Sequence, residues 1–218
     1  MGNPTPSVAE RALATLASQI LVSQPCQRIS FCFGDTYVDG AGYYYVALSL
    51  VSIDNKAKAL GVVINGGLPA NTEAQYDPTT NNLVFPRAGY GTSGFQKMSI
   101  LHELTHAVLD SRAPRQIRRM LDNETTAYLA GALYNVFSAP SATGPFGYSP
   151  GPGNPIYVEA HRLAMKARRQ LEEWNNSFRY NFNPWDVTTL QNAILASPTY
   201  GFIKTNPTGK YGDDGLPL

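Results

Sequence analysis

The segment Ser93–Asp110 constrains the fold of this 218-residue chain more than any other. Ser93 is a suitable helix N-cap, and large apolar residues recur behind it at the spacing of one broad helical face. These residues are Phe95, Met98, Leu101, Leu104, Val108 and Leu109. The segment is therefore predicted to be a helix whose apolar stripe faces a hydrophobic core.

His102 and His106 lie four residues apart in this predicted helix, and Glu103 directly follows the first histidine. Residues four apart point the same way, so both imidazoles can reach one metal ion. Glu103 is turned about 100° from His102, so its carboxylate can lie beside the metal and take a proton from a water that the metal activates. The motif predicts a zinc-dependent hydrolase. The alternative is two histidines on a helix face beside a solvated glutamate.

A catalytic zinc needs a third protein ligand and one open position. Glu124 lies 18 residues after His106 on the next predicted helix. Two helices joined by a short connection pack antiparallel, which would bring the second helix back to the first. We therefore predict Glu124 as the third ligand and keep Asp122 as the alternative. Asp110 follows His106 by one turn of the same helix, so it is poorly placed for a tetrahedral corner.

The sequence His102-Glu103-Leu104-Thr105-His106 followed by Asn123-Glu124 resembles the gluzincin metallopeptidases over roughly residues 75–137. In this resemblance the two histidines match the first ligands, Glu103 the general base and Glu124 the third ligand. The most similar group is that of small bacterial stand-alone zinc-peptidase domains, some of them associated with toxins. The resemblance implies an α+β, zincin-like domain that holds Zn²⁺ and hydrolyses peptide bonds.

Two further features follow from the resemblance. Gluzincins often supply a downstream His or Tyr to the oxyanion, which makes His161 and Tyr157 candidates on one predicted helix, with Tyr128 a third possibility or a residue that orients a ligand. Zincin-like peptidases also carry an edge strand before the active-site helix. Leu83–Phe85 is the candidate to pair with an extended peptide. The alternative is a plain surface hairpin.

The remaining sequence predicts a mixture of helices and short strands in one domain spanning residues 1–218. Helices are expected at Ser7–Val22, from Pro114 through Val136, at Pro155–Trp174 and at Pro184–Leu195. Tyr43–Ile53 is also expected to be a helix, with a strand as the alternative that its β-branched and aromatic residues suggest. Strands are expected at Ile29–Phe33 and Gly61–Asn65 and in a hairpin over Ala74–Arg87. Turn-like or irregular segments are expected at Gly34–Gly42, in a Pro- and Gly-rich loop at about 138–155 that would shape the cleft, and from Thr205 onward.

Composition narrows the class of partner. The formal net charge of +1 gives no field that would attract nucleic acid or an anionic membrane, so the expected partner is a peptide or protein substrate. No Sec-type signal peptide or transmembrane stretch is visible, so the chain is expected in the cytoplasm or exported by another route. Cys26 and Cys32 are close enough for a disulfide, and the sequence leaves that pairing and the oligomeric state open.

Two other functions remain compatible with the motif. The first is a zinc amidase or another hydrolase with a non-peptide substrate. The second is a toxin-effector or binding module that retains the zincin fold, although a pure binding module has no need of the base Glu103.

Overall fold

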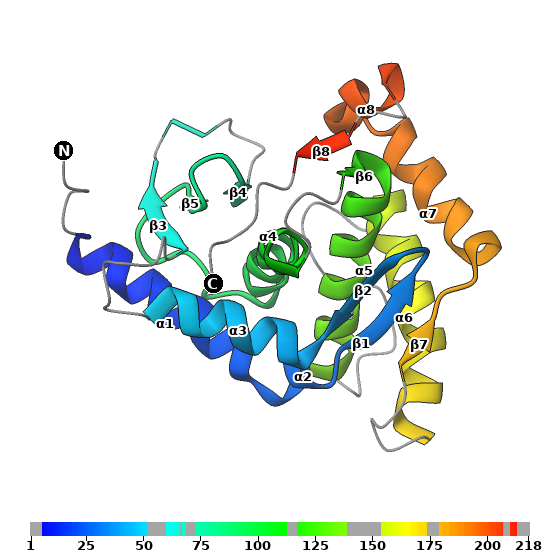
Figure 1. The fold of residues 1–218 in the computed structure, drawn as a ribbon, viewed down its shortest axis with the longest axis horizontal. Coiled ribbons are helices and arrows are strands. Elements are labelled where there is room, and N and C mark those ends of the chain that lie inside the picture. Colours follow the sequence, from blue (N-terminus) through cyan, green and yellow to red (C-terminus); the bar gives the residue numbers. More distant parts are fainter. Residues whose placement is uncertain are drawn as a thin grey trace.

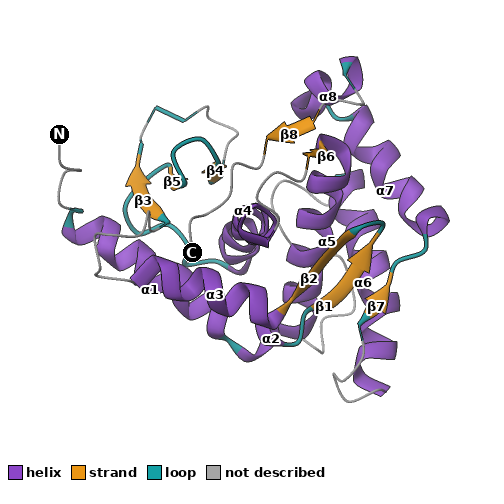
Figure 2. Cartoon of the chain, viewed as in Figure 1, coloured by secondary structure: helices purple, strands orange, loops and turns teal. Residues whose placement is uncertain are grey.

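The computed structural model describes residues 6–51, 60–65, 67–68, 73–112, 117–138, 154–173, 179–206 and 210–212. Within these ranges the chain is mainly helical and carries several short strands, so the predicted α+β class is confirmed (Figure 2). The helices are α1 Val8–Val22, α2 Gln24–Gln27, α3 Gly40–Val51, α4 Gly94–Arg112, α5 Met120–Ser138, α6 Pro155–Glu173, α7 Pro184–Ala196, the 3₁₀ turn η1 Pro198–Tyr200 and α8 Gly201–Thr205. The strands are β1 Ser30–Phe33, β2 Thr36–Asp39, β3 Gly61–Ile64, β4 Gln75–Asp77, β5 Asn82–Phe85, β6 Ile117–Arg119, β7 Tyr180–Asn181 and β8 Lys210–Gly212.

Helix α4 lies at the centre of the molecule (Figure 1). Its first turn is capped by Ser93, whose Oγ accepts a hydrogen bond of 3.1 Å from the backbone N–H of Gln96. The helix packs against α1, α3, α5, β2 and β4, and most of its residues from Ile100 onward are buried. The predicted helix over Ser93–Asp110 is confirmed, with burial on more sides than one apolar stripe requires.

The hairpin predicted over Ala74–Arg87 is also present. Strands β4 and β5 pair antiparallel with Tyr76 opposite Leu83, and β3 adds to β5 in parallel. The sheet order is β3-β5-β4, so β5 is the central strand and the assignment of Leu83–Phe85 as an edge strand is wrong. Pro86 lacks a backbone N–H, but it lies just after the last residue of β5. All residues of the strand itself keep their N–H groups, so β5 can pair on both sides. The edge strand nearest α4 is β4.

The second three-stranded sheet has the order β2-β1-β7. It overturns the prediction of an irregular turn over Gly34–Gly42. Gly34 adopts a positive φ of 56°, which allows a tight hairpin in which Phe33 pairs with Thr36. Helix α3 then begins at Gly40, and Oδ1 of Asp39 accepts from the N–H of Gly42 at 3.0 Å. The helix predicted from Tyr43 therefore starts three residues earlier and is described as far as Val51.

The helix predicted from Pro114 begins later, at Met120. Ile117–Arg119 instead form β6, which pairs antiparallel with β8. Pairing with a segment about 90 residues away overrides the local helical pattern, and it also places a strand in the C-terminal tail that was expected to be irregular. Pro114 and residues 139–153 of the predicted loop lie outside the described residues.

The other helices agree with their predictions. Helix α1 carries a complete capping box between Ser7 and Glu10, and α6 and α7 occupy the segments expected of them. Cys26 and Cys32 are both free thiols. In the described part of the chain, no helix is long and apolar enough to cross a membrane.

Gly131 of α5 sets how closely α5 approaches α4. A Cβ atom at this position would lie 3.1 Å from Cγ of Met98 and 3.4 Å from its carbonyl oxygen. We predict that Gly131→Val lowers the free energy of unfolding by about 1–3 kcal/mol, because overpacking forces the two helices apart. The measurement is urea unfolding. The matched control is Gly201→Val, since a Cβ at Gly201 meets no atom within 4 Å, and equal losses in both variants would contradict the close approach.

Candidate metal centre

Two helices bring His102, His106 and Glu124 together. Their ligand atoms all lie within 4.8 Å of one another, so the group could hold a metal ion. Nε2 of His102 lies 3.3 Å from Nε2 of His106 and 3.3 Å from Oε2 of Glu124. Nε2 of His106 lies 3.7 Å from Oε1 of Glu124. Two imidazoles and one carboxylate are a donor set found in catalytic metal sites, zinc sites among them.

The packing of α4 against α5 positions this group. His102 and His106 face the same way because they are one turn apart on α4. In Figure 1 α4 is seen end-on, whereas the axis of α5 lies in the plane of the picture. The two helices therefore cross and do not lie antiparallel as expected. The crossing nevertheless brings Glu124, in the second turn of α5, against both histidines.

Asn123 determines which nitrogen of His106 is free. Nδ1 of His106 lies 2.7 Å from Oδ1 of Asn123, and both side chains are buried. A carbonyl oxygen only accepts, so Nδ1 of His106 donates and carries the ring proton. Nε2 of His106 therefore keeps its lone pair and faces the site, which is the tautomer that a metal ligand requires.

Glu124 supplies a second observation that fits a metal. Its Oε2 atom is buried and forms no hydrogen bond within the described part of the chain, although His102 lies close by. A buried carboxylate oxygen without a donor is costly. A cation bound by His102, His106 and Glu124 would remove that cost, so the residues present fit the ion that the motif implies.

Glu103 is held beside the group rather than within it. Its Oε2 accepts a hydrogen bond of 2.8 Å from the backbone N–H of Tyr76 in β4, and its Oε1 lies 3.9 Å from Nε2 of His102. Burial, reinforced by the charge of Glu124, raises the pKa of Glu103 to about 7, although His106 and the Tyr76 N–H oppose the rise. Burial would also raise the pKa of Glu124, but the neighbouring His106 and His102 outweigh it and the pKa is lowered. The site thus holds one carboxylate that accepts a proton near neutral pH and one that stays ionised.

Tyrosine side chains surround the open side of the group. The Tyr128 ring meets His102 edge-on at 4.5 Å and the Tyr157 ring at 5.5 Å. The hydroxyls of Tyr128 and Tyr200 are 2.7 Å apart. Burial raises the pKa of Tyr157 to about 12 and that of Tyr128 well above its usual value, so both remain neutral hydroxyl donors. Tyr200 was not predicted to lie near the site, because nothing in its local sequence links η1 to the motif.

The structure separates the other predicted residues. The ring of Tyr157 contacts the ring of Tyr128. His161 lies one turn further along α6, and its role as a donor remains a prediction. Asp110 is buried and accepts from the hydroxyl of Tyr76 at 2.5 Å. The alternative ligand Asp122 is wrong, since it accepts from Arg119 at 2.9 Å and from Gln191 at 3.1 Å. Positions 122 and 124 point in nearly opposite directions around a helix, which explains the separation.

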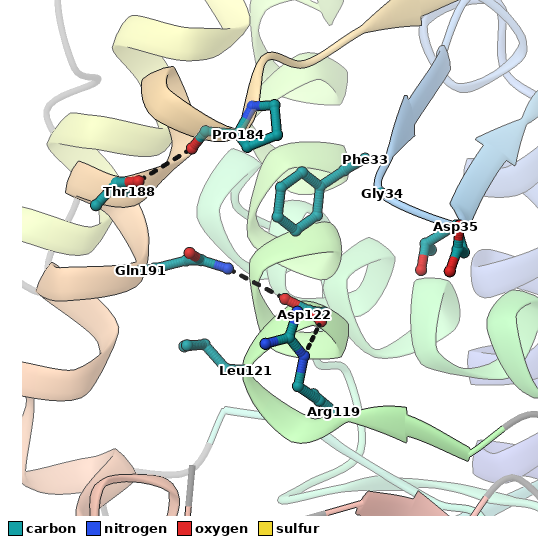
Figure 3. Close-up of a pocket in the computed structure, with 10 residues that line it drawn as sticks. Phe33, Gly34, Asp35, Arg119, Leu121, Asp122, Pro184, Thr188 and Gln191 are labelled. Atoms are coloured by element: carbon teal, nitrogen blue, oxygen red, sulfur yellow. Dashed lines mark hydrogen bonds and ion pairs between the residues drawn. The ribbon is translucent and has the colours of Figure 1, made fainter. Parts of the chain in front are cut away.

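Asp122 faces a different cavity of about 690 Å³ (Figure 3). The cavity lies between the β1–β2 turn, the start of α5 and α7, and Figure 3 shows Arg119 and Gln191 both directed at the Asp122 carboxylate. None of the three grouped ligands lines it. This cavity is therefore separate from the candidate metal centre.

No protein-family model, curated protein or solved structure matches the chain.

We predict that Glu124→Ala weakens Zn²⁺ binding by at least about 100-fold, because it removes one of three ligands. Isothermal titration of metal-free protein with Zn²⁺ measures this. The matched control is Asp122→Ala, two positions away on α5, which is expected to bind Zn²⁺ like the wild type. Full affinity in Glu124→Ala together with a loss in Asp122→Ala would reverse the ligand assignment.

The raised pKa of Glu103 predicts a pH dependence in the metal-free protein. A carboxyl whose pKa is higher in the folded state stabilises the fold below about pH 4.5, and this contribution is lost as the pH rises through about 7. Between pH 5 and pH 8, wild type should therefore lose stability relative to Glu103→Gln, by on the order of 3 kcal/mol at most. Urea unfolding in a chelator at both pH values measures the difference, and parallel pH profiles for the two proteins would argue against a raised pKa.

Proposed function

We propose that this protein is a zinc-dependent peptidase with a zincin-like fold and a gluzincin-type centre. The observation that carries the proposal is the placement of Glu103. Its buried carboxylate lies beside the three side chains that could hold a metal ion, without being one of them. A metal site that only stabilises the fold has no use for a buried base in that position.

His102, His106 and Glu124 would hold the ion. A bound zinc ion would supply Lewis acidity and lower the pKa of water towards about 7. Glu103 accepts the proton of the attacking water at the site and returns it to the leaving amine. The backbone N–H of Tyr76 keeps the carboxylate oriented through both proton transfers.

The developing oxyanion needs a neutral donor at the open side of the site. Tyr157 and His161 remain the proposed donors, and the raised pKa of Tyr157 keeps its hydroxyl protonated. Tyr128 and Tyr200, joined through their hydroxyls, act on the ligands instead. Tyr128 packs against the ring of His102, and its hydroxyl is held by that of Tyr200.

A peptide substrate is favoured by the position of β4. Within the described residues this strand pairs on one side only, with β5. The backbone N–H of its residue Tyr76 donates to Glu103, the proposed general base. Because Glu103 already accepts the Tyr76 N–H on that side, an extended peptide that adds to the free side of β4 would bond to the remaining backbone groups there, beside the candidate ligands. This supports a peptide bond rather than a small non-peptide amide as the substrate, and β4 takes the role that the sequence suggested for Leu83–Phe85.

We predict that purified wild type holds about one zinc per chain and cleaves a mixture of synthetic peptides. Glu103→Gln should keep the zinc but lose at least about 100-fold in kcat, because only the proton acceptor is removed. Metal content by atomic emission and cleavage by mass spectrometry test both halves. A fully active Glu103→Gln variant would refute the assigned base, and zinc-loaded wild type that cleaves small amides but no peptide would identify the other hydrolase class.

A further inference from the structure

The cavity of about 690 Å³ lies on the Asp122 side of α5, away from the candidate metal ligands (Figure 3). Its walls come from separate parts of the chain, namely the β1–β2 hairpin, the end of β6, the first turn of α5 and one face of α7. Its volume falls within the range of about 300–1,000 Å³ that is usual for small-ligand sites. The mechanism proposed for the metal centre uses none of the residues that line it.

The polar side chains of one wall hold one another in place. The Asp122 carboxylate accepts hydrogen bonds from Nε of Arg119 at 2.9 Å and from Nε2 of Gln191 at 3.1 Å (Figure 3). Arg119 keeps the donors of its terminal nitrogens for a ligand, and Gln191 keeps the acceptor Oε1. These planar groups are therefore ordered before a ligand arrives, which lowers the entropy cost of binding one.

Thr36 adds a hydroxyl that the fold does not use. The residue lines the cavity and is only 5% exposed. Its backbone pairs with Phe33 across the hairpin, but its hydroxyl forms no hydrogen bond within the described part of the chain. A nearly buried hydroxyl without a protein partner gains one when a polar ligand fills the space beside it. This feature is independent of the Asp122 network and also indicates a ligand.

The same cavity has an apolar wall. The ring of Phe33 projects towards it from the end of β1, and Pro184 lies beside that ring at the start of α7 (Figure 3). Phe33 is 7% exposed and belongs to the core, so the part of the ring that reaches the cavity is rigid. Rigid apolar groups of this kind pack against the C–H groups of a ligand.

The charges of the lining limit the class of ligand. Arg119 and Asp122 form an ion pair and offset each other. Asp35 stays as the other charge among the described lining residues, and it lies at the exposed tip of the hairpin, where solvent screens it. The cavity therefore lacks the excess of cations that a phosphate or another polyanion needs. It suits a neutral ligand that carries many polar groups.

Hydroxyl groups match this lining best, because each of them both donates and accepts. Neighbouring hydroxyls of one ring can pair with the two polar atoms of a carboxylate, a carboxamide or a guanidinium. A sugar ring combines such hydroxyls with C–H groups on its faces. We propose that the cavity binds a neutral carbohydrate, with Asp122, Gln191 and Thr36 bonded to its hydroxyls and Phe33 and Pro184 against a ring face. This binding site is additional to the proposed peptidase centre and does not depend on it.

Saturation-transfer NMR and calorimetry on the full chain test the proposal. The probes are glucose, galactose, mannose and N-acetylglucosamine, together with maltose, cellobiose, lactose and chitobiose. We expect at least one of them to bind with a Kd of about 1 mM or tighter. Sorbitol has the hydroxyls of a hexose but no ring face, and it should bind at least about tenfold more weakly. Absence of binding by every saccharide, or equal binding of sorbitol, overturns the proposal.

Substitutions test where the saccharide binds. Thr36→Val should leave the urea midpoint unchanged, because the hydroxyl has no protein partner to lose, and should weaken saccharide binding roughly fivefold. Gln191→Leu should weaken it by a similar factor. The matched control is Thr189→Val on α7, whose hydroxyl bonds to Glu159 outside the cavity and whose loss should leave saccharide affinity unchanged.

The metal-ligand variant Glu124→Ala should also bind saccharide like the wild type, which distinguishes the cavity from the metal centre. Saccharide binding that survives both Thr36→Val and Gln191→Leu overturns the assignment to this cavity. Loss of saccharide binding in Glu124→Ala overturns it as well, because the sugar would then be held at the metal centre. Neither result bears on the proposed peptidase activity.

Discussion

The site depends on the contact between the α4 and α5 helices. Helix α4 can present His102 and His106 on one face by itself, but it cannot supply a third ligand at a useful angle. Helix α5 supplies Glu124 as the third candidate ligand and Asn123 as the acceptor that fixes the His106 tautomer. Adjacent residues of one helix thus perform two tasks on the other helix, and a small shift between the helices would disturb both.

The close approach that this requires is built into the sequence of α5. Gly131 leaves room for Met98, and Met98 lies one turn before His102 on α4. The buried face of α5 around it is rich in small residues, including Ala127, Ala130 and Ala132. Small side chains let two backbones approach, so the packing that stabilises the core also sets the distance across which a metal would be shared.

The sequence predicted the parts of the site that follow from helical periodicity. His102, Glu103 and His106 are fixed relative to one another by α4, and Glu124 needed only a second helix packed against the first. What could not be predicted depends on long-range pairing. β6 forms because β8 is available, and β5 becomes central because β3 pairs with it. Tyr200 reaches Tyr128, which packs on His102, from a 3₁₀ turn 72 residues away in the sequence, and no local pattern encodes that approach.

The anchoring of Glu103 shows how sheet and helix chemistry combine. Tyr76 uses its backbone to hold the Glu103 carboxylate and its hydroxyl to reach Asp110 and Asn81. Asp110 lies two turns beyond Glu103 on α4, so one residue of β4 is attached to the helix on both sides of His106. This double attachment fixes the position of β4 relative to the ligand-bearing helix. A substrate strand added to β4 would therefore inherit a fixed position relative to the base, with most of the ordering already accomplished in the free protein.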